Sequence, residues 1–435
     1  MPLAIAIGCM VALFLVLLQL AIHWRFQHPW LLYLLPLAGL AIHYLYLGVG
    51  RSSEKGNNLI LEEVHRPAAG VPGRMAPIIL LATVVTHLFG GSAGREGTAV
   101  QIGGSIAAKF AQRYNLNRQQ KRTLLTCGIA AGFGAVFGTP FTGAVFAVEV
   151  LTLGRINYKD LFFCIIASLV ADVTVTIWGV HHTAYHIDEL VKTRYLWYNF
   201  FPASGWLLLK VFLAAMVFGA ASLLFATLTS RLKTVLAQLI KVKWFIPVVG
   251  GLLVLAFTLI NGKPDYLSLG VEPEYPGAIT ISSAFQAGGA DSWSWLWKTI
   301  YTATTLATGF KGGEVTPLFY IGATLGNTLA SLIHAPISLF AALGFLAVFA
   351  GATKTPLACT IMGMEIFGPA YTIFFAIACF TAYFCSGQSG IYTSQRRSRY
   401  SVKPLSKKPL DRFLRYNHIK LDKYRFKFSG QKKSK

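Results

Sequence analysis

The chain has 435 residues, of which 54% are hydrophobic and 13% are charged. Soluble domains carry about 25% charged residues, so this composition excludes an ordinary soluble enzyme. The formal net charge is +22, but the basic residues gather in the C-terminal segment 396–435 and in the segment 109–122. This distribution is typical of cytoplasmic segments of a membrane protein. We therefore expect the lipid bilayer, and no nucleic acid, as a partner.

Apolar runs that approach or exceed a bilayer-spanning length of about 20 residues follow one another along the chain. They cover residues 2–22, 30–48, 160–179, 206–228, 244–260 and 337–352. Shorter runs interrupted by Gly or Pro lie at 75–90, 98–110, 124–137, 140–153 and 356–366. Broken helices of this kind suit channels and transporters, where irregular backbone lines a cavity. The sequence thus predicts an all-α polytopic membrane protein.

The glycine-dense stretch 90–104 places a lone acid, Glu96, at the predicted start of a helix. A carboxylate in a bilayer costs about 2.5–3.5 kcal/mol. Free N–H groups and the positive end of the dipole at a helix N-terminus make such a place an anion site. A protonatable group that occupies an anion site can also leave it for another anion. The stretch therefore favours an anion/proton exchanger.

Two internal repeats divide the chain. A Thr-Pro pair with a glutamate nine residues after the proline occurs twice, ending at Glu149 and, 216 residues later, at Glu365. The segment 94–103 resembles 312–322 at nearly the same offset. Such repeats in a polytopic protein indicate two pseudo-symmetric bundles with the substrate between them. We interpret Glu149 and Glu365 as acids that hold helix ends.

The predicted organisation is a first transmembrane half-repeat over 1–180, a linker over 181–205, a second half-repeat over 206–395 and a basic cytoplasmic tail over 396–435. The linker holds His181, His182 and His186 without a cysteine or a paired acid nearby in sequence. We expect these histidines in a solvated loop, and no metal site.

The motifs of this chain resemble those of the CLC chloride channels and anion/proton exchangers. Gly94-Arg95-Glu96-Gly97 is similar to the family's GREGP motif, and Gly313-Glu314-Val315-Thr316-Pro317 to its GxFxP motif. Residues 56–60 stand where the family has GSGIP, and Tyr392 stands where it has a late pore tyrosine. The motifs occur in the family's order over about residues 1–400.

The departures from these motifs resemble the fluoride/proton antiporter branch, CLC-F. Asn57 replaces the serine of GSGIP, Thr98 follows the motif where a proline is usual, and Val315 replaces the phenylalanine with Glu314 before it. The inner proton-relay glutamate of the chloride exchangers aligns with Val150. Glu314 is therefore a candidate substitute for that relay.

The resemblance implies a CLC-type inverted-repeat fold with broken and tilted helices, forming a homodimer in a bacterial inner membrane. It implies a transporter rather than an enzyme, with no cofactor, that exports fluoride in exchange for protons. A chloride channel or chloride/proton exchanger is the alternative.

The resemblance also implies the architecture of the site, in which four helix N-termini would converge on a dehydrated anion. Glu96 would act as the gate, filling the anion site when deprotonated and leaving it when protonated, and Glu314 would share the proton transfer. The implied anion-binding residues are Asn57, Gly94, Arg95, Gly97, Val315, Thr316 and Tyr392.

Purely structural roles remain alternatives for several of these residues. Asn57 and Glu314 are alternatively helix caps, Thr316 is alternatively an N-cap before Pro317, and Tyr392 alternatively belongs to an interfacial aromatic belt. Two other protein classes are disfavoured by the sequence. An intramembrane enzyme is disfavoured because no nucleophile or metal motif occurs in the apolar runs, and a structural or receptor protein because buried acids repeat within them.

Overall fold

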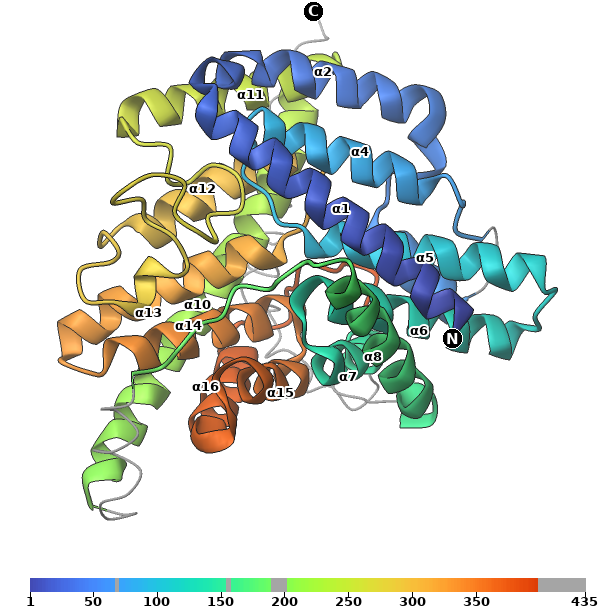
Figure 1. Cartoon of the computed structure of the whole chain (residues 1–435). Helices are drawn as coiled ribbons and strands as arrows, with labels where there is room; N and C mark the ends of the chain where they lie inside the picture. Colours follow the sequence, from blue (N-terminus) through green and yellow to red (C-terminus); the bar gives the residue numbers. More distant parts are fainter. Residues whose placement is uncertain (67–69, 154–157, 189–201, 398–435) are drawn as a thin grey trace, which may run out of the picture. The chain divides into compact units, whose positions relative to one another are not determined.

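The computed structural model describes residues 1–66, 70–153, 158–188 and 202–397, and helices dominate it (Figure 1). The first part of the chain forms α1 (Pro2–Gln27), η1 (Pro29–Leu34), α2 (Leu35–Leu45), η2 (Tyr46–Gly50), η3 (Arg51–Ser53), α3 (Asn57–His65), α4 (Met75–Leu88), α5 (Glu96–Arg113), α6 (Arg118–Phe137), α7 (Pro140–Glu149), η4 (Tyr158–Asp160) and α8 (Leu161–Ile177). The second part forms α10 (Pro202–Leu239), α11 (Phe245–Asn261), η5 (Ser283–Phe285), α12 (Ser294–Ala307), α13 (Val315–Ile333), α14 (Ile337–Thr353), α15 (Pro356–Phe367), η6 (Pro369–Tyr371) and α16 (Thr372–Cys385). Two short strands, β1 (Thr152–Leu153) and β2 (Arg396–Arg397), complete the described elements. The predicted all-α class is confirmed.

Long and short apolar helices alternate, as the sequence predicts. Among the described residues, four helical stretches are long and apolar enough to cross a membrane: Pro2–Gln27, Pro29–His65, Tyr158–Ile177 and Gly205–Leu239. Shorter apolar helices include α4, α11, α14 and α15. The helix α10 already begins at Pro202, so the last residues assigned to the linker are helical.

Glycines allow the helices of each half to pack closely, and they do so at equivalent places. A β-carbon at Gly103 in α5 would lie 2.0 Å from the carbonyl oxygen of Gly128 in α6. A β-carbon at Gly322 in α13 would likewise lie 2.0 Å from the carbonyl oxygen of Gly344 in α14. Each pair therefore brings two helix backbones into contact, as small residues do between membrane helices.

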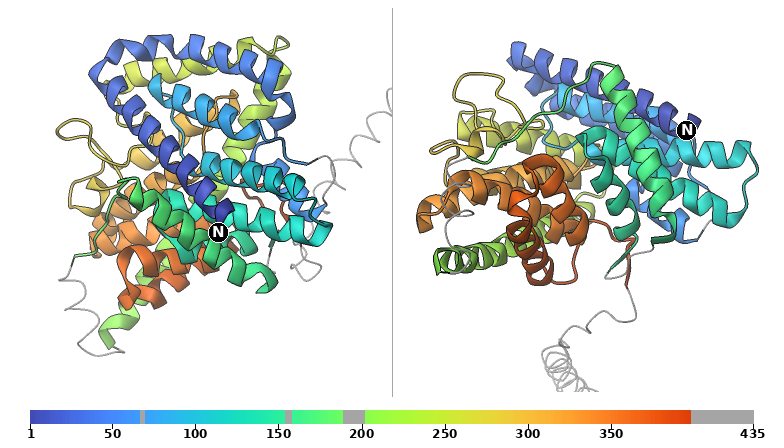
Figure 2. Two further views of the ribbon diagram at one scale, coloured as in Figure 1. Left: turned by 45° about the vertical axis from the view of Figure 1, so that its right-hand side comes forward. Right: turned by 60° about the horizontal axis from the view of Figure 1, so that its bottom comes forward.

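The helices α7 and α15 cap each other, and they lie side by side in Figures 1 and 2. The carboxylate of Glu149, at the end of α7, accepts hydrogen bonds from the backbone N–H groups of Leu357 (3.1 Å) and Ala358 (2.7 Å) in the first turn of α15. The carboxylate of Glu365 in α15 accepts in return from the N–H groups of Phe141 (2.9 Å) and Thr142 (2.7 Å) in α7. Both acids thus hold helix ends, which confirms their interpretation.

An aromatic core joins the two parts of the chain. Phe133 of α6 stacks on Phe146 of α7 with ring centroids 4.2 Å apart and faces Phe349 of α14 at 6.1 Å. Phe319 of α13 stacks on Phe345 of α14 at 3.8 Å. These rings are almost fully buried and pack beside the helix starts that form the site.

Candidate functional site

The two copies of the glycine motif meet directly. Gly94 and Gly313 form an isolated antiparallel bridge, in which each backbone N–H donates to the other's carbonyl at 2.6 and 2.7 Å. The bridge sets the start of α5 against the start of α13, since α5 begins at Glu96 and α13 at Val315. Two helix N-termini therefore converge on one place, and each presents free N–H groups there.

The Glu96 carboxylate occupies the N-terminus of the opposite helix. Its Oε2 accepts hydrogen bonds from the backbone N–H of Thr316 at 3.0 Å and from that of Arg95 at 3.1 Å. The hydroxyl of Thr316 donates to Oε1. The side chain of Glu96 is fully buried, and the Arg95 Nε lies 3.9 Å from Oε1. A carboxylate thus sits where an anion would receive the same N–H and O–H donors.

Glycines at the junction have no room for a side chain. A β-carbon at Gly94 would lie 2.7 Å from Oε2 of Glu96, and one at Gly313 would lie 2.7 Å from the backbone nitrogen of Gly97. A β-carbon at Gly97 would lie 3.0 Å from both the Asn57 Nδ2 and the Gly313 Cα. The predicted Gly94 and Gly97 therefore serve by letting the backbones approach, not by contributing side chains.

Asn57 lies next to this junction at the start of α3. The N-cap of α3 is Gly56, in a left-handed conformation with φ of +57°, and no side chain caps the helix. The alternative of Asn57 as a cap is therefore wrong, because the helix starts at Asn57 itself. Its amide nitrogen lies against Gly97, and its Oδ1 is buried without a hydrogen-bond partner. The amide nitrogen is thus the atom of Asn57 that faces the junction.

Glu314 precedes α13 at the N-cap position, but its side chain makes no capping hydrogen bond. Its partly buried carboxyl lies close enough to Glu96 for the two charges to interact. Val315 is buried beside it as the first residue of α13. The alternative of Thr316 as an N-cap is wrong, because the helix begins one residue earlier. A second acid therefore stands next to Glu96 without being used as a cap.

Tyr392 is buried, with 7% of its surface exposed, and it follows α16 in irregular backbone. The N–H of the preceding Ile391 donates to the carbonyl of Ala352 at 2.9 Å, which ties this segment to the end of α14. Burial argues against the alternative of an interfacial aromatic belt. The implied helix N-terminus at Tyr392 is not observed over residues 386–395, where the glycines 387 and 390 favour turns.

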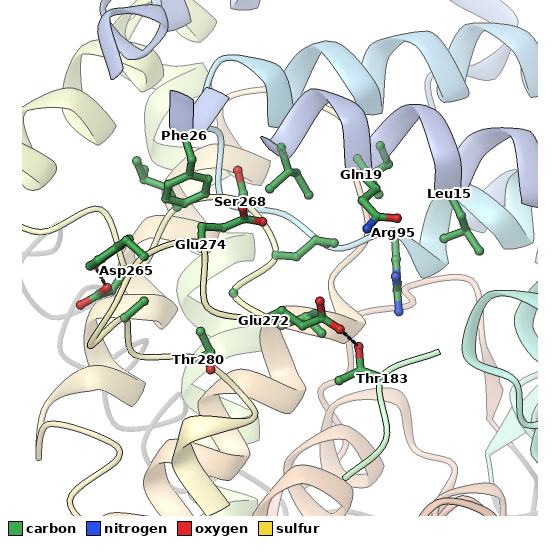
Figure 3. A pocket seen from close by; sticks show the side chains of 18 of the residues that line it. Leu15, Gln19, Phe26, Arg95, Thr183, Asp265, Ser268, Glu272, Glu274 and Thr280 are labelled. Atoms are coloured by element: carbon green, nitrogen blue, oxygen red, sulfur yellow. Dashed lines mark hydrogen bonds between the residues drawn. The ribbon is translucent and has the colours of Figure 1, made fainter. Parts of the chain in front are cut away.

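Two cavities lie beside Arg95. The larger, of about 120 Å³, is bounded by α1 and by the loop between α11 and α12 (Figure 3). The smaller, of about 30 Å³, lies against Thr316. Arg95, Thr183 and Val271 line both, so they form the wall between the cavities. In Figure 3 the Arg95 side chain reaches toward Thr183, whose hydroxyl donates to the Glu272 carboxylate at 2.7 Å.

Comparison with known proteins identifies the family. The family model described as voltage gated chloride channel matches residues 35–387. The chain belongs to this family, the CLC family. A CLC relative described as a chloride/fluoride channel protein, from Pseudomonas syringae pv. tomato, is 47% identical over 395 residues, which cover 90% of this chain and 84% of the relative. An H(+)/Cl(-) exchange transporter of Salmonella arizonae is 26% identical over 314 residues, covering 67% and 61% of the two chains.

Solved CLC structures share the fold. The crystal structure of a CLC-type fluoride/proton antiporter superposes with a TM-score of 0.83 and 32% identity, over 91% of this chain and 96% of that one. The structure of a slow cyanobacterial Cl-/H+ antiporter superposes with a TM-score of 0.71 at 17% identity, over 90% and 95% of the two chains, and shows the fold alone. The chain is thus an integral membrane protein with the CLC fold.

The structure brings together Asn57, Glu96, Glu314 and Thr316, which the sequence had grouped, and it adds contacts that the sequence did not indicate. The direct bridge between the two glycine motifs could not be read from their spacing. His182 was expected in a solvated loop, yet it lines the smaller cavity with Arg95 and Thr316. Within the part of the chain that the structure describes, no three His, Cys, Asp or Glu side chains are grouped to hold a metal ion.

Proposed function

We propose that this protein is a fluoride/proton antiporter that exports fluoride from the cytoplasm in exchange for protons. The observation that carries the proposal is the position of the Glu96 carboxylate on the N–H and hydroxyl of Thr316. Carboxylate and substrate anion compete for these donors. When Glu96 binds a proton it loses its charge and its hold on the site, and an anion replaces it. The 47% identical chloride/fluoride channel protein and the fluoride/proton antiporter structure support fluoride as the anion.

The donors around Glu96 suit fluoride. A small, strongly hydrated anion gives up its water only where charge-dense hydrogen-bond donors replace it. Backbone N–H groups, the Thr316 hydroxyl, the Asn57 amide and the hydroxyl of Tyr392 are donors of this kind. Chloride is larger and softer, and it gains less from such donors. We therefore propose that these four kinds of donor bind the anion, and that Arg95 lies at the outer side of the anion site.

Glu314 is proposed to pass the proton between Glu96 and the cytoplasm. Its carboxyl lies within electrostatic range of Glu96 and caps no helix. The position used by the relay glutamate of chloride exchangers is Val150, which is 1% exposed and carries no proton. A permanently charged acid beside an anion site would repel the substrate. Glu314 therefore takes part by being protonated for part of the cycle.

The distribution of charge gives the proposed orientation. The turn between α5 and α6 is flanked by Arg113 and Arg118 within the basic segment 109–122, whereas the loop between α11 and α12 carries Asp265, Glu272 and Glu274. The excess of basic residues marks the cytoplasmic side. The helix α5 thus descends from Glu96 to the cytoplasm, and the larger cavity opens outward. We propose on the same reasoning that the basic tail lies in the cytoplasm.

We further propose that two copies of the chain form a homodimer, with one transport pathway in each subunit. Large apolar side chains are exposed on helices of both halves, such as Phe163 in α8 and Ile373 in α16. These faces contact lipid or a second subunit. Mass measurement in several mild detergents is expected to give the dimer, and a monomer in all of them would contradict the proposal.

Liposomes that hold the purified protein test the function. Loaded with fluoride, they are expected to release fluoride and take up protons together, and loaded with chloride they are expected to release far less. Preferred chloride release with proton uptake would instead identify a chloride/proton exchanger. Anion release without proton movement would identify a channel.

A further inference from the structure

The segment that follows α8 places two neighbouring histidines in the two cavities beside Arg95. His181 lines the larger, outward-facing cavity, and His182 lines the smaller one, which touches Thr316. The mechanism above uses neither residue. It does require protons to reach Glu96, whose side chain is fully buried. A route from the outer solution to Glu96 must therefore pass through other groups.

His182 is held in place by two helices. Its ring packs on Gly138 at the end of α6, where a β-carbon would lie 2.5 Å from Cδ2 and where φ is +69°. Its Nε2 lies 3.9 Å from Oδ1 of Asp172 in α8, and each of these two side chains is 21% exposed. An acid in a membrane-spanning helix is costly and marks a functional site. The pair thus stands at the border between the solution and the interior.

A short gap separates His182 from the gate. The cavity between His182 and Thr316 has about 30 Å³, and a water needs roughly 10–15 Å³. On its far side the Thr316 hydroxyl is bonded to Oε1 of Glu96. Water in this cavity would complete a chain of groups that can exchange protons, from the imidazole through water and the hydroxyl to the carboxylate.

We infer that His182 is the outer proton-transfer residue of this transporter, and that Asp172 is the residue that positions it. The inference rests on the proposed antiport. The imidazole takes one proton from the outer solution and gives one to the cavity water. The water, through Thr316, protonates the Glu96 carboxylate, and the imidazole returns to its neutral form. The neutral Glu96 then leaves the anion site.

The charges around His182 favour transfer over trapping of the proton. Arg95 at the start of α5, His181 on the same segment and Asp172 in α8 are charged groups that face His182, and Tyr185 lines the same cavity. Glu365 in α15 acts on Asp172. Burial, and then the charges of Arg95 and His181, lower the pKa of His182 to about 4. A lowered pKa means that the protonated imidazole gives up its proton readily to the cavity water.

The test is coupled fluoride/proton exchange by the full chain in liposomes, with wild-type protein compared with His182→Gln and His182→Ala. The wild-type exchange must be present, and its absence would count against the proposed function rather than against this inference. In both variants the exchange rate should fall by about tenfold. This is less than the roughly 100-fold typical of a group that acts directly, because water can still enter the cavity. The number of fluoride ions moved per proton should stay unchanged.

Imidazole added to the outer solution should restore the rate of His182→Ala, and imidazole trapped inside should not. Asp172→Asn, which alters no packing volume, should slow exchange more mildly. His186→Gln is the matched control, because His186 is exposed on the same segment and lines neither cavity beside Arg95. Rates of the His182 variants equal to that of His186→Gln would overturn the inference. So would a slow rate that outer imidazole leaves unchanged while Asp172→Asn is fully active.

Discussion

The hydroxyl of Thr316 offers the sharpest test of the gate, because it can be removed while the backbone stays. Thr316→Val has nearly the same shape and keeps the N–H that donates to Oε2 of Glu96 at 3.0 Å. It lacks the hydroxyl that donates to Oε1. A hydrogen bond to a charged group contributes about 1.5–3 kcal/mol. With tenfold per 1.4 kcal/mol, the closed position of Glu96 should lose roughly 10- to 150-fold in occupancy relative to its alternatives.

A gate that closes less firmly lets fluoride pass without a proton. We expect Thr316→Val to move more fluoride per proton than the wild type when both fluxes are recorded from the same liposomes. Thr316→Ser keeps the hydroxyl and should retain the wild-type ratio. The reasoning would be refuted if Thr316→Val showed the same ratio as Thr316→Ser, because the hydroxyl would then not hold the gate.

Three further predictions concern neighbouring groups. Glu314→Gln and Glu314→Ala should both lose fluoride-driven proton flux. Near-normal coupled flux in both variants would show that Glu314 has only a structural role and that protons reach the cytoplasm through water alone. Asn57→Ser should raise chloride efflux relative to fluoride efflux, since a hard amide donor is lost. An unchanged ratio of the two effluxes would show that other residues determine anion selectivity. Glu149→Gln should lower the stability by about 1–3 kcal/mol, seen as earlier thermal unfolding in detergent, because the N–H groups of Leu357 and Ala358 lose a charged acceptor. Unfolding at the wild-type temperature would show that this cap contributes nothing.

Much of the site could be predicted because the roles of several residues follow from their immediate neighbours in the sequence. Glu96 follows a glycine-rich stretch, and an acid after such a stretch is a natural first residue of a helix. The repeated glutamates Glu149 and Glu365 stand at matching distances from Thr-Pro pairs, and this shared pattern indicated that both hold helix ends. The structure adds that each binds the start of the other's helix. In each case the residues that make up the sequence pattern are also the residues that form the helix end, so the pattern alone was sufficient.

The rest depends on contacts between segments far apart in the chain. The spacing of the two glycine motifs indicates a repeat, but not that Gly94 and Gly313 bond to each other. Asn57 looked like a possible cap, and only the left-handed conformation of Gly56 moves the cap one residue earlier. His182 was predicted to lie in a loop, and it does. Its packing on Gly138 depends on where α6 ends, and the residues next to His182 in the sequence give no information on that.

The central claim is that Glu96 couples the two fluxes by competing with fluoride for the donors of Thr316. The most direct measurement imposes a pH gradient, acidic outside, on liposomes with equal fluoride inside and outside, and follows the internal fluoride. Wild-type protein should drive fluoride outward from the liposomes against its developing gradient, and Glu96→Gln should drive none. Uphill fluoride movement of wild-type size in Glu96→Gln, or none in the wild type, would contradict the account.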